Sequence, residues 1–350
     1  MKVLIIGGGL SGICLGHTFL NKGVDFKILD AGINHSSKIA AGMINPMVFR
    51  KMVKTWKGDE LIPFLNAFYP SIEEKIGAKF FFPRKIRRVF STQDELDKWN
   101  QRLNDKDYED YIYAFDDSDP TPEYAINEFG SGWVKSPGYI DAKIFVRENQ
   151  RYFINKGKMI TESFDFGKFD SDNKTYKDEK YTHFIFSEGY KAVENPYFKY
   201  LPFVLTKGEV LSIKNDELRK DEILNRKCFV LPAQDGSFKI GSTFEWNTTD
   251  ASPSEGAKEQ LLEQYGLLVR SPVSVIDQEA GIRPTVADRR PLIGIHPEKE
   301  SVYIFNGMGT KGYMLAPYFA NELYHYLVND TPLNTEVDIK RFYRKHYNKA

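Results

Sequence analysis

Cysteine is nearly absent from this chain of 350 residues, since only Cys14 and Cys228 occur. Two cysteines cannot build a disulfide framework or a multi-cysteine metal site, and so few are typical of a reducing compartment. Net charge is also absent: 48 basic residues balance 48 acidic ones, so no overall attraction to nucleic acid or membrane is expected. Long hydrophobic runs are missing too, because the apolar start Val3–Ile6 is too short for a signal or membrane segment. These absences predict a cytoplasmic protein with no metal site and no membrane partner.

The chain nevertheless has ample material for a core. Its hydrophobic content is 41%, and its length exceeds what one core usually serves. Two closely joined domains in one chain are therefore expected.

The N-terminal segment carries a dinucleotide-binding pattern. Val3–Ile6 is a short β-branched run typical of a central strand in a parallel sheet, and a G-x-G-x-x-G motif follows it at once. The first glycine allows a tight turn, the second lets backbone N–H groups approach a pyrophosphate, and the third lets the next helix pack on the strand. The phosphates would then face the start of that helix. The residues expected to contact them are Gly7, Gly9, Leu10, Ser11 and Gly12.

A second strand is predicted at Phe26–Asp30, and it ends in an acid. Asp30 lies 18 residues after Gly12, where a carboxylate can accept hydrogen bonds from an adenosine ribose. An acid at this place argues against the 2′-phosphate of NADP, but it does not separate NAD from FAD.

Three further segments narrow the cofactor. The small residues of Ser36–Pro46 would let a backbone lie flat against a planar ligand, and Gly281–Gly294 precedes a second strand-glycine-helix pattern at Val302–Pro317. Together with the N-terminal motif, these segments resemble the D-amino-acid oxidase-like superfamily of FAD enzymes. That superfamily includes glycine oxidase, sarcosine oxidase and the oxidase domain of the bifunctional tRNA wobble-uridine modification enzyme. The resemblance recurs at the strand opening Lys207–Val210 and at the hairpin Leu231–Thr243.

The resemblance implies an α/β fold, in which a Rossmann-like FAD-binding domain is interleaved with an α+β substrate domain. We expect 1–50, 136–200 and 280–350 in the FAD-binding domain, and 51–135 and 201–279 in the substrate (cap) domain. It also implies noncovalent FAD, because no cysteine lies in the C-terminal flavin segments. Beyond the phosphate-binding turn, the implied cofactor contacts are Asp30, Ser37, Ala41, Gly42, Met43, Ile160, Gly189, Gly309, Thr310, Lys311, Gly312 and Tyr313.

Amine oxidation by a flavin needs the C–H bond held against the ring and positive charge where the reduced ring becomes an anion. Arg283 is expected to bind a substrate carboxylate, because guanidinium offers a bidentate fork and the resembling position in amino-acid oxidases has that role. Lys311 is expected to stabilise the reduced flavin. The alternatives are a structural arginine that pairs with Asp288 or the chain end, and a solvated lysine.

Other features bear on the substrate less directly. Two basic clusters, Arg50–Lys57 and Arg84–Arg88, are either solvated faces over apolar core or a surface that recruits an anionic substrate such as tRNA. The strand end Ser187–Tyr190 replaces the small Ala-x-Gly pattern that is usual in relatives, so the carboxylate of Glu188 is expected near the nucleotide. The polar run Ser171–Lys180 predicts an exposed loop.

The sequence therefore predicts an FAD-dependent oxidoreductase that acts on the C–N bond of a small amino acid or secondary amine, with molecular oxygen as one candidate acceptor. Two alternatives stay open. One is an FAD-dependent oxidase of an aminomethyl-modified tRNA wobble uridine, and the other is a non-catalytic dinucleotide-binding protein. The oligomeric state is not indicated.

Overall fold

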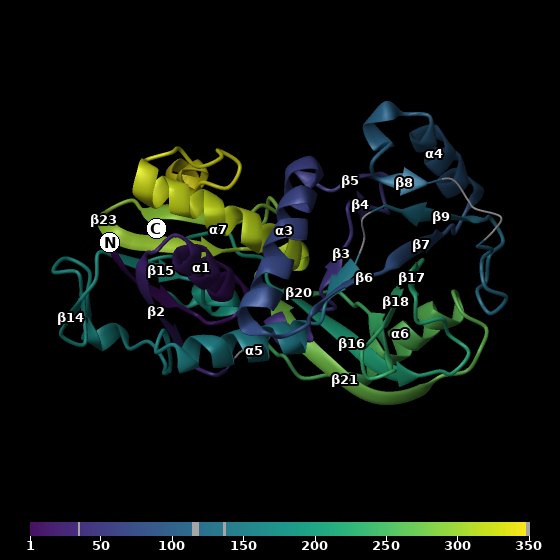
Figure 1. Cartoon of the computed structure of the whole chain (residues 1–350), viewed down its shortest axis with the longest axis horizontal. Coiled ribbons are helices and arrows are strands. Elements are labelled where there is room, and N and C mark those ends of the chain that lie inside the picture. The colour runs from purple at the N-terminus through teal and green to yellow at the C-terminus, as the bar shows by residue number, and fades with distance from the viewer. Residues whose placement is uncertain (34–35, 114–118, 136–137, 348–350) are drawn as a thin grey trace.

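A computed structural model describes residues 1–33, 36–113, 119–135 and 138–347 of the chain. Two large sheets lie at opposite ends of the molecule, each with its own helices (Figure 1). The α-helices are α1 (Leu10–Asn21), α2 (Ser36–Ile39), α3 (Gly58–Ile76), α4 (Gln93–Leu103), α5 (Ala142–Asn155), α6 (Glu255–Gly266) and α7 (Gly312–Asn329). Short 3-10 helices occupy Lys106–Tyr108, Phe166–Lys168, Gly189–Val193, Gly309–Lys311 and Ile339–Phe342, and a π-helical turn occupies Tyr343–Tyr347.

The first sheet has six strands and confirms the predicted Rossmann-like architecture. In spatial order they are β11 (Met159–Thr161), β2 (Asp25–Asp30), β1 (Lys2–Ile6), β15 (His183–Phe186), β23 (Lys299–Asn306) and β22 (Leu292–His296). All neighbours are parallel except β22, which runs antiparallel to β23. The N-terminal strand is therefore central, as its sequence predicts.

Strand β1 is apolar from Val3 to Ile6 because both faces of the first sheet are covered. Val3 and Ile5 pack into the core beneath α1, α5 and α7, whereas Leu4 and Ile6 pack into a separate core on the opposite face. All four side chains are at most 4% exposed. A strand covered on both sides reads as an uninterrupted hydrophobic run rather than as an alternating one.

The run Ser171–Lys180 is mostly exposed, as its polarity predicts, but it contains a hairpin and is not an irregular loop. It contributes to a small antiparallel sheet of β12 (Phe169–Asp170), β13 (Thr175–Tyr176) and β14 (Glu179–Lys180), which packs on the first sheet. Tyr176 is the anchor, because it is 4% exposed and its ring stacks on Phe164 with centroids 4.6 Å apart. The buried side chain of Tyr176 therefore anchors this otherwise polar hairpin to the first sheet.

The second sheet has nine strands. Along its main path they are β20 (Glu245–Trp246), β16 (Thr206–Lys214), β19 (Phe238–Gly241), β18 (Phe229–Pro232), β17 (Glu222–Asn225), β7 (Lys85–Val89), β9 (Ser131–Val134) and β8 (Ile112–Tyr113), while β21 (Ser274–Arg283) pairs with β16. Helix α6 covers one face through Leu261 and Tyr265. Helix α4 covers part of the other face through Trp99.

Helix α3 packs into the core of the first sheet. Its Leu61 and Leu65 are fully buried in the core of the first sheet, and it packs against α7. The hydroxyl of Tyr69 donates a hydrogen bond of 2.6 Å to the carbonyl oxygen of Tyr313. Helix α3 is therefore part of the hydrophobic core and joins α7 to the first sheet.

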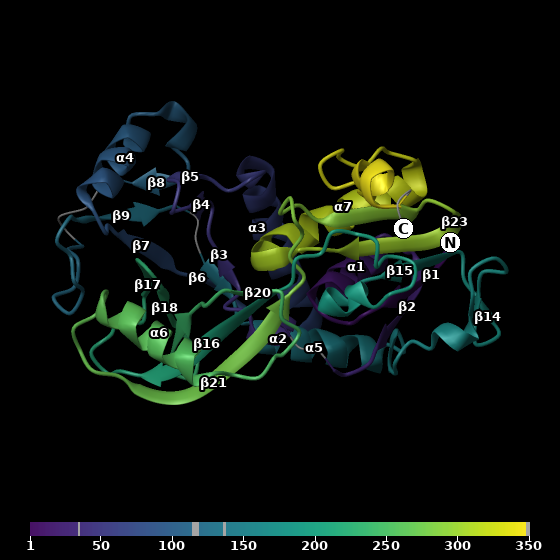
Figure 2. The same ribbon diagram turned by 180° about the vertical axis from the view of Figure 1, so that it is seen from behind.

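The chain passes repeatedly between the two sheets, as the interleaved arrangement predicts. Seen from behind, β21 leaves the nine-stranded sheet and runs toward α2 and the first sheet (Figure 2). Two minor sheets fill the junction: β3 (Met43–Ile44), β10 (Gly138–Ile140) and β6 (Phe81–Pro83) form one, and β4 (Met47–Val48) with β5 (Val53–Lys54) forms the other. Within the described ranges, no helix combines the length and the apolar character that crossing a lipid bilayer requires.

Candidate functional site

A cavity of about 670 Å³ lies where the carboxyl ends of β1, β2, β15 and β23 face the nine-stranded sheet. Ligands of open α/β sheets bind outside the carboxyl ends of the strands, so this is the expected position for a nucleotide. Loops of the first sheet line one part of the cavity. Residues from β16 to β21 of the second sheet line the other part.

The turn between β1 and α1 can be built only with glycine at two positions. Gly7 has a φ of +111°, and a Cβ there would lie 2.4 Å from the carbonyl oxygen of Ser187. A Cβ on Gly12 would lie 1.9 Å from the carbonyl oxygen of Gly7. Gly9 precedes α1 without any side-chain cap, and it lines the cavity together with Ser11. Although the N–H of Leu10 donates to the hydroxyl of Ser37, the start of α1 still presents the next backbone N–H groups and the positive end of the helix dipole to a bound anion.

The acid that ends β2 also faces the cavity. Asp30 accepts a hydrogen bond of 2.6 Å from the side-chain amide of Gln150 and one of 3.1 Å from the backbone N–H of Gly32. The neighbouring strand β11 pairs with β2 as far as Asp30. Just after β11, the N–H of Glu162 donates to the carbonyl oxygen of Asp30 at 2.8 Å. These hydrogen bonds hold the Asp30 carboxylate at the carboxyl end of β2, where a ribose would lie.

The small-residue segment forms a second wall. Gly42 has a φ of +67°, and a Cβ there would lie 1.9 Å from the carbonyl oxygen of Ile140, so this backbone packs directly on β10. Ser37 accepts a hydrogen bond of 3.1 Å from the N–H of Leu10, and its carbonyl oxygen accepts one of 2.7 Å from the hydroxyl of Tyr313. The segment is therefore tied to the starts of both α1 and α7.

Lys311 lies at the start of α7 and lines the cavity. Its ammonium donates to the carbonyl oxygen of Asn45 at 3.0 Å and to the hydroxyl of Thr55 at 2.5 Å. Burial lowers the pKa of this lysine to about 8. It is therefore not a freely solvated lysine, and at neutral pH it keeps a positive charge in the cavity wall.

Arg283 ends β21 and lines the cavity from the side of the second sheet. Its guanidinium donates to the hydroxyl of Ser242 at 2.9 Å and to the carbonyl oxygens of Thr243 and Lys207 at 3.2 and 3.3 Å. It also lies over the ring of Phe244, with 4.7 Å between Cζ and the ring centroid. Desolvation lowers its pKa to about 10.

The acceptors of Arg283 are all neutral. No ion pair involves this arginine among the residues that the structure describes. The alternative pairing with Asp288 is wrong, because Asp288 instead binds Arg341 at 2.8 Å. The guanidinium is therefore positioned by the protein while its charge remains uncompensated.

Glu188 lines the cavity at the end of β15, as the sequence predicts for this carboxylate. One of its oxygens accepts a hydrogen bond of 2.7 Å from the side-chain amide of Asn195. Burial raises the pKa of Glu188 to about 7. A group with this pKa changes charge within the physiological pH range.

Most of the predicted site residues lie together in the cavity wall. Those that line it are Gly7, Gly9, Leu10, Ser11, Asp30, Ser37, Ala41, Gly42, Met43, Gly189, Arg283, Gly309, Thr310, Lys311, Gly312 and Tyr313. Gly12 does not line it, because this glycine packs against the turn instead. Ile160 does not line it either: its side chain is 42% exposed on β11, the outermost strand of the sheet.

Several lining residues were not found by sequence reasoning. Glu162, Ser163 and Phe164 stand just beyond the end of β11, two to four positions after Ile160, and the rule that ligands bind past the strand ends could have found them. Lys227 comes from a turn of the second sheet that carries no motif, whereas Phe244 directly follows the hairpin Leu231–Thr243, whose resemblance to the family could have pointed to it. Burial raises the pKa of the lining thiol of Cys228 to about 12, so it stays protonated at neutral pH.

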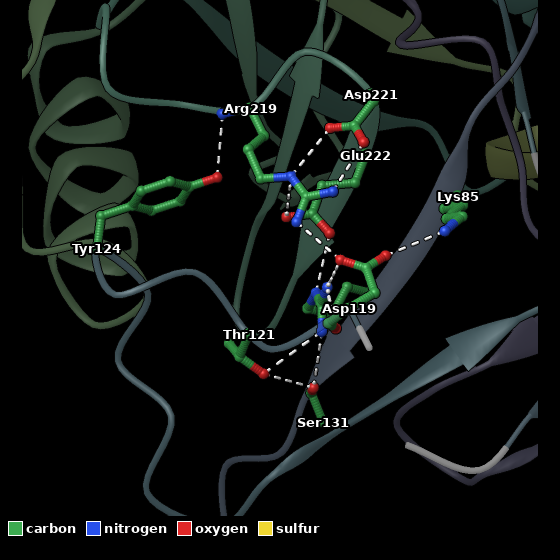
Figure 3. Close-up of polar contacts among 9 residues, drawn as sticks. Lys85, Asp119, Thr121, Tyr124, Ser131, Arg219, Asp221 and Glu222 are labelled. Carbon is green, nitrogen blue, oxygen red and sulfur yellow. Dashed lines mark hydrogen bonds and ion pairs between the residues drawn. The ribbon is translucent and has the colours of Figure 1, made fainter. Parts of the chain in front are cut away.

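Two of the four basic residues in the cluster Arg84–Arg88 are interior, whereas Arg84 is half-buried and Lys85 is exposed. Arg87 is completely buried and pairs with Glu222 at 2.9 Å and with Asp119 at 3.3 Å, and Arg88 is 4% exposed and pairs with Glu95 at 2.9 Å. Figure 3 shows how Asp119 also binds Lys85 and Arg219 in the same network. Both sequence interpretations of this cluster, a solvated face and a nucleic-acid surface, are therefore wrong for Arg87 and Arg88.

Two lysines of the cluster Arg50–Lys57 also form ion pairs with nearby carboxylates. Lys54 pairs with Asp59 at 3.2 Å, and Lys57 pairs with Glu60 at 3.1 Å. Both pairs include an exposed carboxylate, so they lower the positive charge of this surface but contribute little stability.

Comparison with known proteins identifies the family. A family model described as FAD dependent oxidoreductase, abbreviated DAO, matches residues 2–325. Glycine oxidase of Bacillus licheniformis is 31% identical over 137 residues, which cover 38% of this chain and 37% of that enzyme. The tRNA 5-methylaminomethyl-2-thiouridine biosynthesis bifunctional protein MnmC of Marinobacter nauticus is 22% identical over 98% of this chain and 58% of its own length.

A solved structure has the same fold over nearly the whole chain. Glycine oxidase of Geobacillus kaustophilus superposes with a TM-score of 0.80 at 19% identity, covering 97% of this chain and 98% of that one. By contrast, the sequence matches span less than two thirds of the length of the curated relatives.

Proposed function

Because the chain belongs to the FAD-dependent oxidoreductase (DAO) family, we propose that it binds FAD noncovalently in this cavity and oxidises the C–N bond of a small amino acid or secondary amine. The main support for the proposal is the environment of Arg283. A guanidinium in a cavity wall, held only by neutral acceptors, is suited to bind an anionic group of a ligand.

The cavity residues fit FAD. The glycine turn leaves backbone N–H groups bare for a pyrophosphate, and Asp30 lies at the adjacent strand end for a ribose. The backbone of Ala41–Met43 and the start of α7 would hold the flavin ring between the two sheets. The protonated thiol of Cys228 is a poor nucleophile, which favours noncovalent binding.

The chemistry that FAD supplies when bound is acceptance of a hydride from the carbon beside the substrate nitrogen, which leaves an imine that water hydrolyses. Arg283 would contribute by fixing the substrate carboxylate, and so the position of the neighbouring carbon. Its hydrogen bonds to Ser242, Thr243 and Lys207 fix the guanidinium plane before any ligand arrives.

Lys311 would contribute positive charge near the ring. A lysine ammonium has three donors, and Asn45 and Thr55 take two of them, so one remains for the cavity. Charge that is positioned in advance in a poorly solvated site stabilises a developing anion more than charge in water does.

A second candidate is oxidation of an aminomethyl-modified uridine in tRNA. It rests on the similarity to MnmC, which extends over 98% of this chain. The burial of Arg87 and Arg88 reduces one of the two basic surfaces that would have favoured it.

The proposal is tested by mixing the purified flavoprotein, without oxygen, with amino acids, N-methyl amino acids, simple amines and RNA that carries aminomethyl uridine. We expect at least one amino acid or N-methyl amino acid to bleach the oxidised flavin, and heat or acid to release intact FAD. Bleaching by RNA alone would favour the second candidate. Colourless protein that takes up only NAD would contradict the proposal.

A further inference from the structure

The turn between β17 and β18 carries a second basic side chain into the cavity wall. Lys227 lies in this turn, lines the cavity and is exposed. No hydrogen bond or ion pair involves its ammonium among the described residues. The cavity side of the turn therefore presents a positive charge that the protein does not neutralise.

The sheet places this turn beside the residues that hold Arg283. Phe229, the first residue of β18, pairs with Gly241 of β19. The next residue along, Ser242, accepts the hydrogen bond of Arg283. Adjacent strands lie about 4.8 Å apart, so Lys227 and Arg283 belong to the same end of the cavity.

Hydrogen bonds from Arg88 and Arg226 fix the conformation of the turn between β17 and β18. Arg88 donates to the side-chain oxygen of Asn225 at 2.8 Å and also to the carbonyl oxygen of Arg226. The N–H of Arg226 donates to the carbonyl oxygen of Cys228 at 2.9 Å. The guanidinium of Arg226 reaches across to the carbonyl oxygen of Leu267 at 2.7 Å. Because a lysine side chain is long and flexible, Lys227 can reach a ligand group by rotating its side chain, without movement of the backbone of the turn.

Charge is distributed unevenly along the cavity. The lining carboxylates of the described chain are Asp30, Glu162, Glu188 and Glu194, and all four lie at or after the ends of β2, β11 or β15 of the first sheet. The end of the cavity that the second sheet forms is lined by the cations Lys227 and Arg283, and among the described residues that sheet contributes no lining carboxylate. A ligand at that end is therefore favoured when it carries more than one negative group.

We propose that Lys227 binds a second anionic group of the substrate, so that the preferred substrates are amines with two acidic groups, one held by Arg283 and one by Lys227. This inference rests on the proposed function, because it uses the same site and assigns the first acidic group to Arg283. Lys227 acts here as a specificity-determining residue and takes no part in electron transfer.

The test compares two substrates that differ by one carboxylate. Sarcosine is N-methylglycine and iminodiacetate is N-carboxymethylglycine, so the ratio of their KM values measures recognition of the second acid. We expect Lys227→Gln to raise the ratio of the iminodiacetate KM to the sarcosine KM about 3- to 10-fold, somewhat above the effect of an exposed ion pair. The change should shrink at high salt.

The matched control is Lys220→Gln. Lys220 precedes β17, is also exposed and does not line the cavity, so removing its charge should leave the KM ratio as it is in the parent protein. Equal ratios in the parent and in Lys227→Gln would overturn the proposal, and so would equal changes in the two variants.

A binding measurement separates this inference from the proposed function. Diglycolate has an ether oxygen in place of the iminodiacetate nitrogen, so it cannot be oxidised at a C–N bond, but it keeps both carboxylates. We expect it to perturb the flavin absorbance with a Kd that rises 3- to 10-fold in Lys227→Gln. If no amine reduces the flavin but this dependence holds, the proposed function fails and the Lys227 site stands. If diglycolate does not bind, or binds both proteins equally, the Lys227 site is wrong.

Discussion

At the scale of single residues, the site depends on charged groups that the protein only partly removes from water. Lys311 shows this most clearly, since two neutral acceptors hold its ammonium and burial lowers its pKa to about 8. The protein thus holds a charge where solvation is poor, which is unfavourable unless a bound anion compensates it.

Replacing Lys311 should change the redox balance of the bound flavin. Lys311→Met removes the charge, and we expect the midpoint potential to become more negative by about 30–60 mV, because 30 mV corresponds to about 1.4 kcal/mol for two electrons and a hydrogen bond to a charged group contributes about 1.5–3 kcal/mol. The difference should be largest below pH 8, where the lysine is protonated, and should shrink above that pH.

Spectroscopic titration against a redox dye measures this potential. Lys38→Met is the control, because Lys38 lies on α2 next to the cavity wall but does not line it. Identical potentials for Lys311→Met and the parent protein would show that the ammonium does not act on the flavin.

Glu188 predicts a pH dependence of stability in the protein without cofactor. Burial raises its pKa from 4.5 to about 7, so between these pH values the folded protein keeps a proton that the unfolded chain has lost. The stability contribution of this group is therefore fully present below pH 4.5 and is lost as the pH rises through 7. Glu188→Gln should remove that loss and gain about 1–3 kcal/mol relative to the parent at pH 8, with little gain at pH 4.5.

Urea unfolding of the apoprotein at both pH values provides the measurement. Glutamine keeps an oxygen that can accept the hydrogen bond from Asn195, so the comparison isolates the charge. A gain of the same size at both pH values would mean that ionisation of Glu188 is not its cause.

At the scale of elements, the turn between β1 and α1 separates a glycine needed for folding from one needed for binding. A Cβ on Gly12 would overlap the carbonyl oxygen of Gly7, whereas the nearest atom to a Cβ on Gly9 is the hydroxyl oxygen of Ser37 at 3.0 Å. Gly9 also lines the cavity, where a pyrophosphate would approach the backbone.

We expect Gly9→Val to fold and to lose FAD, and Gly12→Val to fail to fold. Cofactor content after purification, measured by absorbance, and far-UV circular dichroism distinguish the two outcomes. Stoichiometric FAD in folded Gly9→Val would exclude this turn as the phosphate site.

Elements with a local signal were predictable from the sequence, and those held by distant contacts were not. The strand at Val3–Ile6, the glycine turn and helix α1 follow each other within 21 residues, so apolar pattern and turn chemistry suffice to find them. The hairpin at Ser171–Lys180 depends on Tyr176 stacking on Phe164, and the burial of Arg87 depends on Glu222, which is 135 residues away along the chain. No local pattern records such partners.

At the scale of the whole molecule, the candidate site is made from two halves that only the fold brings together. The first sheet supplies the glycine turn, Asp30 and Lys311, and the second supplies Arg283 and Lys227. Sequence reasoning found the first half through its motifs, but in the second half it found only Arg283, because turns such as Asn225–Cys228 have no characteristic pattern. The division into an FAD-binding domain and a substrate domain stays a prediction.

We propose that Arg283, from the second sheet, holds the substrate carboxylate against a flavin bound by the first sheet. The most direct test is the rate of anaerobic flavin reduction in the parent protein, Arg283→Lys and Arg283→Ala, by an amino-acid substrate and by the amine that lacks its carboxylate. Loss of a partly buried charge partner costs on the order of 2–5 kcal/mol, so Arg283→Ala should lower kcat/KM for the amino acid tens to thousands-fold.

Arg283→Lys should recover only part of that loss, because lysine keeps the charge without the fork. The amine without a carboxylate should be oxidised poorly by all three proteins, with much smaller differences among them. If Arg283→Ala retains FAD and is reduced by the amino acid as fast as the parent protein, the carboxylate is not held by Arg283 and the account is wrong.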